Sequence, residues 1–284
     1  MKKSVKGARF TPKNYSDEIE AKIQHYKREG YKLPMRHLLR TEEQLAGIRE
    51  SAKINTALLD YISENIREGM STAEIDHMVY CFTTDHDAIP APFQYERFPK
   101  SVCVSINDVV CHGIPSTKEF LRSGDIVNVD VSTIYKGYFS DASRMFMIGE
   151  VSTEMQRLVQ VTKECRDIGI QAAQPWARLG DVGAVIQEHA EKNGYSVVRD
   201  LCGHGVGVKF HEEPDVEHFG KRGTGMLIVP GMTFTIEPMI NMGSYEVFID
   251  EADGWTVCTD DGLPSAQWES MILITEDGNE ILTQ

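Results

Sequence analysis

The stretch IVNVDVSTIYKGYFSDASRMFM, residues 126–147, decides the fold of this chain. From Val127 to Val131, valine alternates with polar residues, and this period of two is typical of a strand with one buried face. Tyr135-Lys136-Gly137 supplies a turn, and the residues from Tyr138 onward have the composition of a returning strand. The stretch therefore predicts an antiparallel β-hairpin.

Each predicted strand of this hairpin carries one aspartate. If the two-residue loop falls at Tyr135-Lys136, Asp130 and Asp141 lie directly opposite each other, with Cβ atoms about 4.5–5.5 Å apart. Two carboxylates at this distance destabilise a sheet and raise each other's pKa unless a cation lies between them. A divalent metal would explain the pair. The alternative is that both are solvated surface acids and that the register differs by one or two residues.

Outward from the hairpin, the chain shows helices followed by strands, and it does so twice. In residues 40–150, Thr41 and Gln44 form a predicted capping box before an amphipathic helix that extends as far as Gly69, and Ser71 starts a second helix. In residues 153–284, helices are predicted over 153–173 and 180–193, before glycine-rich strands. This order predicts an α+β fold of two similar halves.

The composition is that of a globular protein with enough chain to bury a large core. The 284 residues are 41% hydrophobic and 25% charged. No apolar run approaches the ~18 residues of a membrane span, and the N-terminus lacks the features of a secretory signal, so we expect a cytoplasmic protein with no membrane contact. The six cysteines form no CxxC pair, which favours neither a disulfide framework nor a thiolate zinc site.

The charge is divided unevenly along the chain. Residues 1–40 hold eleven Lys and Arg against four acids, which gives a charge of +7. Because the net charge of the whole chain is −14, residues 41–284 must carry −21. An acidic body repels phosphates, and we expect no direct DNA binding. Ser16 is a predicted cap for a short helix containing Ile19 and Ile23. We therefore divide the chain into a basic N-terminal extension, residues 1–40, and a main domain, residues 41–284.

Two later glutamates lie in strands that are expected to be buried. Glu237 ends the run TFTIE before Pro238, and Glu269 precedes the apolar stretch MILI. A buried, ionised carboxylate needs a partner. Each glutamate alone is more often a surface or edge residue, but with the two aspartates they would place four carboxylates in the core, which is hard to explain without metal.

Three histidines complete the candidate set. His204 lies in GHGVG, where the flanking glycines are expected to let the backbone approach a ligand closely. His211 follows seven residues later, and His112 lies in CHGIP. A single histidine is more often a structural hydrogen-bonding group than a ligand, and the remaining six, His218 among them, lie in no special pattern. Phosphate loops, zincin helices and serine-nucleophile elbows are not found in the sequence.

Five motifs together carry a resemblance to a known family. CHGIP at 111–115, VNVDV at 127–131, GHGVG at 203–207, FTIEP at 234–238 and SAQWE at 265–269 resemble those of the type I methionine aminopeptidases, in the same order. The resemblance runs from about Arg40 to the C-terminus. It implies the pita-bread fold, in which two pseudo-twofold halves share antiparallel sheet covered by helices, here with a short N-terminal extension.

The resemblance also implies an activity, a cofactor and partners. The activity is removal of the N-terminal initiator methionine from nascent proteins and peptides, through attack on the first peptide bond by hydroxide activated at two divalent metal ions. Mn²⁺, Fe²⁺, Co²⁺ and Zn²⁺ all suit the oxygen-rich ligand set. Nascent N-termini that begin with methionine are the expected partners. The basic extension either docks on ribosomal RNA near the nascent-chain exit or is a solvated, flexible arm.

Residue by residue, the resemblance assigns roles to positions in this chain. Asp141 and Glu269 would bridge the two metals, and Glu237 would also move protons. His211 would support the developing oxyanion, and His112 would contact the scissile amide nitrogen. The complete implied metal set is Asp130, Asp141, His204, Glu237 and Glu269, and the methionine pocket is lined by Tyr95, Phe98, Cys103, Phe210 and Trp255 beside His112 and His211.

The chain departs from the family pattern in two places, and three rival interpretations remain. Ser270-Met271 stands where many members have His-Thr, and Pro92-Phe93 replaces small residues or cysteine beside the pocket.

A prolidase or aminopeptidase P would use the same five ligands, but those enzymes usually carry an N-terminal domain much larger than forty residues. A binding module that has lost catalysis would lack ligands, whereas every ligand position here is filled. A metal-regulated structural protein is the third interpretation.

Overall fold

The computed structural model describes residues 16–284, which form five α-helices, two short 3₁₀ helices and fifteen strands. The α-helices are α1 (Asp17–Arg28), α2 (Glu42–Asn65), α3 (Thr72–Asp85), α4 (Thr153–Ala172) and α5 (Leu179–Lys192), and the 3₁₀ helices are Arg36–Leu38 and Tyr95–Arg97. The strands of the first half are β1 (Ile89–Pro90), β2 (Cys103–Ile106), β3 (Val109–Cys111), β4 (Ile126–Tyr135) and β5 (Tyr138–Met147). Those of the second half are β6 (Ser196–Val197), β7 (Gly203–Gly205), β8 (Glu212–Val216), β9 (Thr233–Ile236), β10 (Met239–Asn241), β11 (Val247–Ile249), β12 (Val257–Thr259), β13 (Ser265–Gln267), β14 (Ser270–Ile274) and β15 (Asn279–Ile281).

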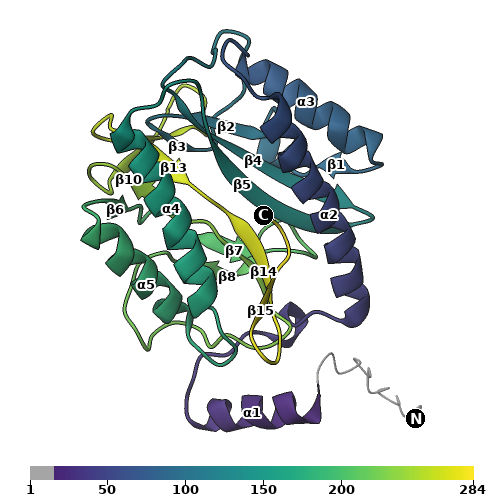
Figure 1. The fold of residues 1–284 in the computed structure, drawn as a ribbon. Helices are drawn as coiled ribbons and strands as arrows, with labels where there is room; N and C mark the ends of the chain where they lie inside the picture. The colour runs from purple at the N-terminus through teal and green to yellow at the C-terminus, as the bar shows by residue number, and fades with distance from the viewer. Residues whose placement is uncertain (1–15) are drawn as a thin grey trace.

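The strands form four sheets in which every neighbouring pair is antiparallel. One sheet has β4 at its centre, paired with β1 and β2 along one side and with β5 along the other, and another has the order β15-β14-β9-β7-β8. Two three-stranded sheets, β13-β10-β6 and β11-β12-β3, complete the arrangement. Helices α2 and α3 lie at one side of the strands and α4 and α5 at the other (Figure 1). The predicted pita-bread fold, with antiparallel sheet covered by helices, is confirmed.

The helices begin where the sequence places their caps. The Thr41–Gln44 and Ser71–Glu74 capping boxes are both formed, and Ser16 caps α1 through the backbone N–H of Ile19. Helix α2 ends at Asn65, four residues before the predicted end at Gly69. Local side-chain chemistry therefore determines the starts of these helices more closely than their ends.

The central hairpin is confirmed, but its predicted register is wrong by two residues. The loop is Lys136-Gly137, both with positive φ (50° and 84°), so Tyr135 pairs with Tyr138. Two-residue hairpin loops of this kind favour glycine because both central residues adopt left-handed backbone conformations. Asp130 consequently lies opposite Ser143, and Asp141 lies opposite Ser132. The two aspartates are diagonal neighbours and still share one face of the hairpin.

Each half of the molecule buries its own apolar cluster. In the first half, Val127, Val129 and Val131 are completely buried between the sheet and helices α2 and α3. In the second half, buried side chains of α4, α5, β9 and β14 form one cluster, to which Ile19 and Ile23 of α1 also belong. The described part of the basic extension is thus packed against the main domain. Residues 1–15, which hold five of its eleven cationic side chains, lie outside the described residues.

No helix within residues 16–284 is both long enough and apolar enough to cross a membrane.

Candidate metal centre and active site

A cavity of about 580 Å³ opens among the sheets. Its wall contains all twelve residues that the sequence assigned to the site: Asp130, Asp141, His204, Glu237, Glu269, His112, His211, Tyr95, Phe98, Cys103, Phe210 and Trp255. The first half supplies the two aspartates, and the second half supplies His204 and both glutamates. The residues of the predicted site therefore come from both halves of the chain, which the fold brings together around one cavity.

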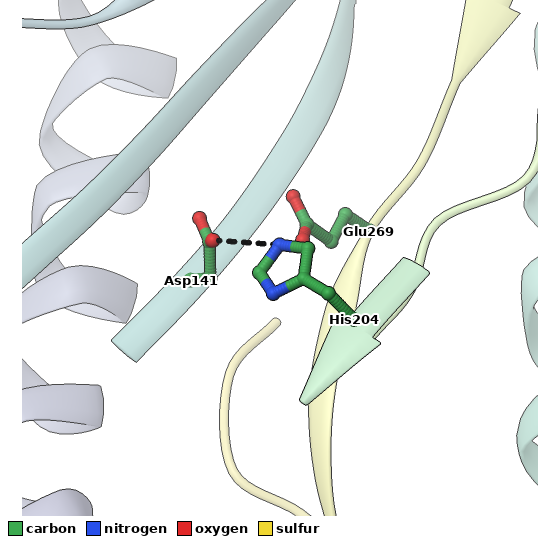
Figure 2. Close-up of side chains that lie close together, drawn as sticks. All are labelled: Asp141, His204 and Glu269. Atoms are coloured by element: carbon green, nitrogen blue, oxygen red, sulfur yellow. Dashed lines mark ion pairs between the residues drawn. The ribbon is translucent and has the colours of Figure 1, made fainter. Parts of the chain in front are cut away.

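Strands and the residues directly beside them bring the candidate ligand side chains to this cavity. Asp130 and Asp141 project from one face of the β4–β5 hairpin, and His204 is the middle residue of β7. Glu237 follows β9 directly, and Glu269 lies between β13 and β14. Figure 2 shows Asp141, His204 and Glu269 converging from three separate segments.

The donor atoms of these side chains lie within a few ångströms of one another. His204 Nε2 is 3.6 Å from Asp141 Oδ2 and 3.7 Å from Glu237 Oε1. One donor atom each from Asp141, His204 and Glu269 fits within a span of 4.8 Å. His204 Nδ1 lies 3.1 Å from the carbonyl oxygen of Gly205. Donation from Nδ1 to this carbonyl leaves the Nε2 lone pair facing the carboxylates, as in the usual orientation of a metal-binding histidine.

A second set of polar groups orients the carboxylates. The Ser132 hydroxyl donates to Asp141 Oδ1 at 2.7 Å, and the Thr235 hydroxyl donates to Glu237 Oε1 at 2.6 Å. Gln267 Nε2 donates to Glu237 Oε2 at 3.1 Å. The sequence analysis missed these three residues, although the strand period offers a signal. Thr235 and Gln267 lie two residues before the candidate ligands Glu237 and Glu269. Ser132 lies two residues after Asp130, on the same face of β4.

His218 is a further residue that the sequence analysis missed. Its side chain is 1% exposed, and its Nε2 accepts a hydrogen bond from the backbone N–H of Glu237 at 3.1 Å. Burial lowers the pKa of His218 to about 3, so the ring is neutral and able to accept. No local pattern marks this histidine, because its partner lies nineteen residues away in the sequence.

Burial of four carboxyl groups in one centre makes their ionised forms unfavourable without a cation. Burial raises the pKa of Asp130 to about 7 and that of Glu237 to about 8. Burial, and then repulsion from neighbouring carboxylates, raise the pKa values of Asp141 and Glu269 as well. Among the described residues, Asp130 Oδ1 is buried with no hydrogen-bond partner. An ionised carboxylate is stable in such a place only beside opposite charge.

The donor set fits divalent metal ions. Four carboxylates and one imidazole make an oxygen-rich group that suits Mn²⁺, Fe²⁺ and Co²⁺ as well as Zn²⁺. The His204 ring can act as a neutral ligand, because burial and the nearby His211 lower its pKa to about 3. Four carboxylates lining one cavity also supply enough negative charge to balance two divalent ions.

Several lining residues of the cavity are aromatic. The ring of Phe210 lies 4.8 Å from that of Tyr95, and the ring of Phe98 lies 5.2 Å from that of Trp255. Cys103 pairs with Asp130 across β2 and β4 and therefore lies beside the metal ligands. An aromatic lining with a thiol suits an unbranched, polarisable side chain such as that of methionine.

The two remaining predicted histidines flank the carboxylates. The ring centroid of His211 is 4.2 Å from that of His204, and the ring of His112 is 6.1 Å from that of Trp255. Burial, followed by the charge of His112, lowers the pKa of His211 to about 4, and burial also lowers the pKa of His112. Both rings are neutral at pH 7, and each has one N–H to donate.

The glycines around His204 have a role in addition to the one expected. A Cβ atom on Gly205 would lie 2.1 Å from the carbonyl oxygen of Glu213, and one on Gly203 would lie 2.8 Å from that of Thr235. Both contacts are with neighbouring strands, so these glycines admit the backbones of β8 and β9. The expected close approach of a ligand stays a prediction.

The two departures from the family pattern lie at the edges of the site. Ser270 is buried, and within the described part of the chain its hydroxyl has no hydrogen-bond partner. Ser270 therefore gives no support to the neighbouring Glu269 carboxylate. Pro92 lines the cavity, whereas the side chain of Phe93 is 45% exposed and lies beside it.

Comparison with known proteins gives consistent results. The sequence profile of metallopeptidase family M24 matches residues 46–276. A methionine aminopeptidase of Rickettsia prowazekii is 46% identical over 245 residues, which cover 86% of this chain and 94% of the relative. Methionine aminopeptidase A of Synechocystis sp. is 48% identical over 245 residues, covering 86% of this chain and 96% of the relative.

Solved structures support the same fold. The crystal structure of the Rickettsia prowazekii methionine aminopeptidase aligns with a TM-score of 0.85 at 46% identity, covering 87% of this chain and 99% of that one. A prolidase from Pyrococcus furiosus aligns with a TM-score of 0.69 at 22% identity, covering 87% of this chain and 65% of that one. The likeness to the prolidase is a likeness of fold alone.

Proposed function

This chain belongs to metallopeptidase family M24 and is a methionine aminopeptidase, a metal-dependent hydrolase that removes the initiator methionine, and from this premise we propose roles for its residues. Asp130, Asp141, His204, Glu237 and Glu269 would hold two divalent ions, with Asp141 and Glu269 contributing to the binding of both. The observation that carries this assignment is that four carboxylates and one imidazole line a single cavity, with donor atoms of Asp141, His204 and Glu269 within 4.8 Å of one another.

When bound, the ions would lower the pKa of a coordinated water molecule to near neutrality, which would provide a nucleophile at neutral pH. Glu237 is placed to hold and pass on a proton. Hydrogen bonds from Thr235 and Gln267 fix both of its oxygens, and the N–H of its own backbone is held by His218. A carboxylate fixed in this way can take a proton and deliver it to the leaving amine without reorienting.

His211 and His112 act on the substrate. The N–H of the neutral His211 ring is proposed to donate to the carbonyl oxygen of residue one as negative charge develops there, and His112 is proposed to contact the scissile amide nitrogen. Donors that are fixed in place and aimed at a developing charge stabilise the transition state more than the bound substrate. Both histidines should therefore affect kcat more strongly than KM.

The aromatic lining selects the first residue of the substrate. Tyr95, Phe98, Phe210 and Trp255, with Cys103, enclose a slot for the methionine side chain. Thioether sulfur makes favourable contacts with aromatic rings, and a flexible, unbranched chain adapts to an irregular slot.

The substrates in the cell are nascent polypeptide N-termini that begin with methionine. We place the enzyme in the cytoplasm, where translation occurs. Residues 1–40 serve as a basic extension of the catalytic domain, residues 41–284, and this extension is proposed to bring the enzyme to ribosomal RNA. Its net charge of +7, against −21 for the rest of the chain, supports this proposal, because phosphate binding depends on clustered cationic side chains.

Two measurements test these roles. The metal-loaded enzyme should hydrolyse Met-Gly-Met-Met and leave Ala-Pro peptides intact, and the reverse preference would contradict the assigned substrate. His211→Ala should lower kcat by about 10²-fold with metal content unchanged, whereas His37→Ala, at an exposed position outside the cavity, should behave as the wild type. Loss of metal from His211→Ala would make this residue a ligand instead.

A further inference from the structure

Arg40 is a buried arginine that lies outside the cavity, at the entrance to α2. It is 2% exposed, and its backbone N–H donates to the carbonyl oxygen of Gly231 at 2.9 Å. Its Nε donates to the Thr233 hydroxyl at 3.0 Å, and its Nη2 donates to the carbonyl oxygen of Val206 at 3.3 Å. A buried guanidinium needs a counter-ion as well as hydrogen bonds.

The counter-ion is Glu212, the residue that directly follows His211. Arg40 Nη2 forms a close ion pair with Glu212 Oε1, and the two side chains are 1% and 7% exposed. The same carboxylate oxygen accepts the backbone N–H of Lys209 at 3.5 Å. Glu212 is therefore fixed from two directions, by the guanidinium and by the connection that precedes it.

Both ends of the β7–β8 connection thus meet at one guanidinium. Val206 begins this connection, Glu212 is the first residue of β8 after it, and Phe210 and His211 lie between them. Two backbone hydrogen bonds shape the part between: Gly207 N–H donates to the carbonyl oxygen of Lys209 at 3.1 Å, and Phe139 N–H donates to that of Gly207 at 2.9 Å. From the cavity side, the ring of Tyr95 packs 5.1 Å from that of His211.

We infer that Arg40 is a positioning residue for catalysis, which holds the β7–β8 connection so that His211 keeps its place beside His204. The inference rests on the proposed role of His211. Without the guanidinium, the Glu212 carboxylate would be left buried and unpaired, and it would turn toward water in the adjoining cavity. His211 is joined to Glu212 by one peptide bond and would move with it. The planar fork of arginine serves two acceptors at once, and the compact ammonium group of lysine does not reproduce this geometry.

The test uses the full chain loaded with Mn²⁺ and the substrate Met-Gly-Met-Met. Arg40→Met should lower kcat by about ten- to a hundredfold, the range expected for an ångström-scale displacement of a catalytic group, with KM within threefold of the wild type and metal content unchanged. Arg40→Lys should show a smaller loss and serves as the working variant if Arg40→Met does not fold. Arg49→Met, which breaks the Arg49–Glu280 ion pair between α2 and β15, is the matched control and should leave kcat unchanged.

A double-mutant cycle separates positioning from a general structural effect. In the His211→Ala background, the Arg40 substitution should change kcat by less than twofold, because the group that it positions is already absent. Full additivity of the two substitutions would overturn the inference, and so would a wild-type kcat in folded Arg40→Met. If His211→Ala itself has a wild-type kcat, the proposed role of His211 fails first, and this outcome is distinct from additivity.

The inference also fixes how the basic extension should be removed. Deletion of residues 1–40 would remove Arg40 together with the extension, so lost activity could not be attributed to lost docking. Deletion of residues 2–15 takes away five cationic side chains and leaves Arg40 in place.

Discussion

Binding of metal to the metal-free protein should release protons, and the number released can be worked out from the site. With pKa values of about 7 and about 8, the carboxyl groups of Asp130 and Glu237 together hold about two protons at pH 6 and about a tenth of a proton at pH 9. At their ordinary values near 4, the same two groups would hold less than about a tenth of a proton at pH 6. Ionised carboxylates bind the metal, so these protons must leave.

The other ligands affect the expected number in known directions. The pKa values of Asp141 and Glu269 are raised as well, so these residues add to the release. His204, with a pKa of about 3, is already neutral at pH 6 and contributes nothing. We therefore expect metal binding to release at least about two protons per chain at pH 6. At pH 9 the number released should be smaller by about two.

Calorimetric titration with Mn²⁺ in two buffers of different ionisation enthalpy measures this release. Asp130→Asn should reduce it by about one proton at pH 6, and Asp277→Asn, in the turn after β14 and away from the cavity, should leave it unchanged. Release of less than about half a proton at pH 6 would refute the reasoning, because it would mean that the carboxylates are ionised in the metal-free protein without any cation.

The same pKa values make the stability of the metal-free protein depend on pH. A carboxyl pKa that is raised on folding stabilises the folded state fully below the unfolded value of about 4, and this contribution is lost as the pH rises through the folded value. For Asp130, the rise from 3.8 to about 7 corresponds to about 4 kcal/mol. The Tm of the metal-free protein should fall between pH 5 and pH 8, and that of the metal-loaded protein should fall much less.

Three further predictions concern a ligand, a glycine and the extension. Asp141→Asn should lower kcat/KM by at least about 10²-fold and reduce the metal content, because loss of a residue that only supports a metal ligand already lowers metal affinity or activity by about 10–100-fold. Full activity at two metals per chain would exclude a bridging role. Gly205→Ala should destabilise the protein by about 1–3 kcal/mol in denaturant unfolding, because its Cβ would overlap the carbonyl of Glu213, whereas Gly278→Ala, with its nearest neighbour at 3.5 Å, should have little effect. Deletion of residues 2–15 should weaken cosedimentation with ribosomes and flatten its salt dependence, and an unchanged, salt-independent association would remove the proposed docking role.

The helices were predictable because their starting signals are local. Ser16, Thr41 and Ser71 each cap a helix through a side chain and a backbone N–H only three residues apart. The hairpin was predictable for the same reason, since its alternating pattern needs no distant partner. Its register was not, although Gly137 carried the necessary signal. A loop placed one residue later satisfies both left-handed positions and moves Asp141 from Asp130 to Ser132.

Within the candidate site, the sequence identified the groups that are chemically unusual for their surroundings. Glu237 and Glu269, acids beside apolar stretches, stand out without any structure. The expectation that they lie within strands is wrong, because Glu237 follows β9 and Glu269 lies between β13 and β14. The groups that support them do not. His218 and Arg40 look like ordinary residues in the sequence, because their partners are supplied by elements 19 and 172 positions away.

The sequence by itself determined which residues are chemically unusual for their surroundings and where the main helices and the central hairpin lie. Capping, strand alternation and an acid in an apolar stretch each depend on a few neighbouring positions. Only the tertiary structure decided how those residues are placed relative to one another. Asp130 and Asp141 are diagonal neighbours, and the glycines beside His204 allow neighbouring strands to approach closely. The guanidinium of Arg40 binds Val206 and Glu212, at the two ends of the connection that carries His211. The physical reason is distance along the chain. Contacts between remote segments depend on how whole sheets and helices pack, and no short stretch of sequence records that packing.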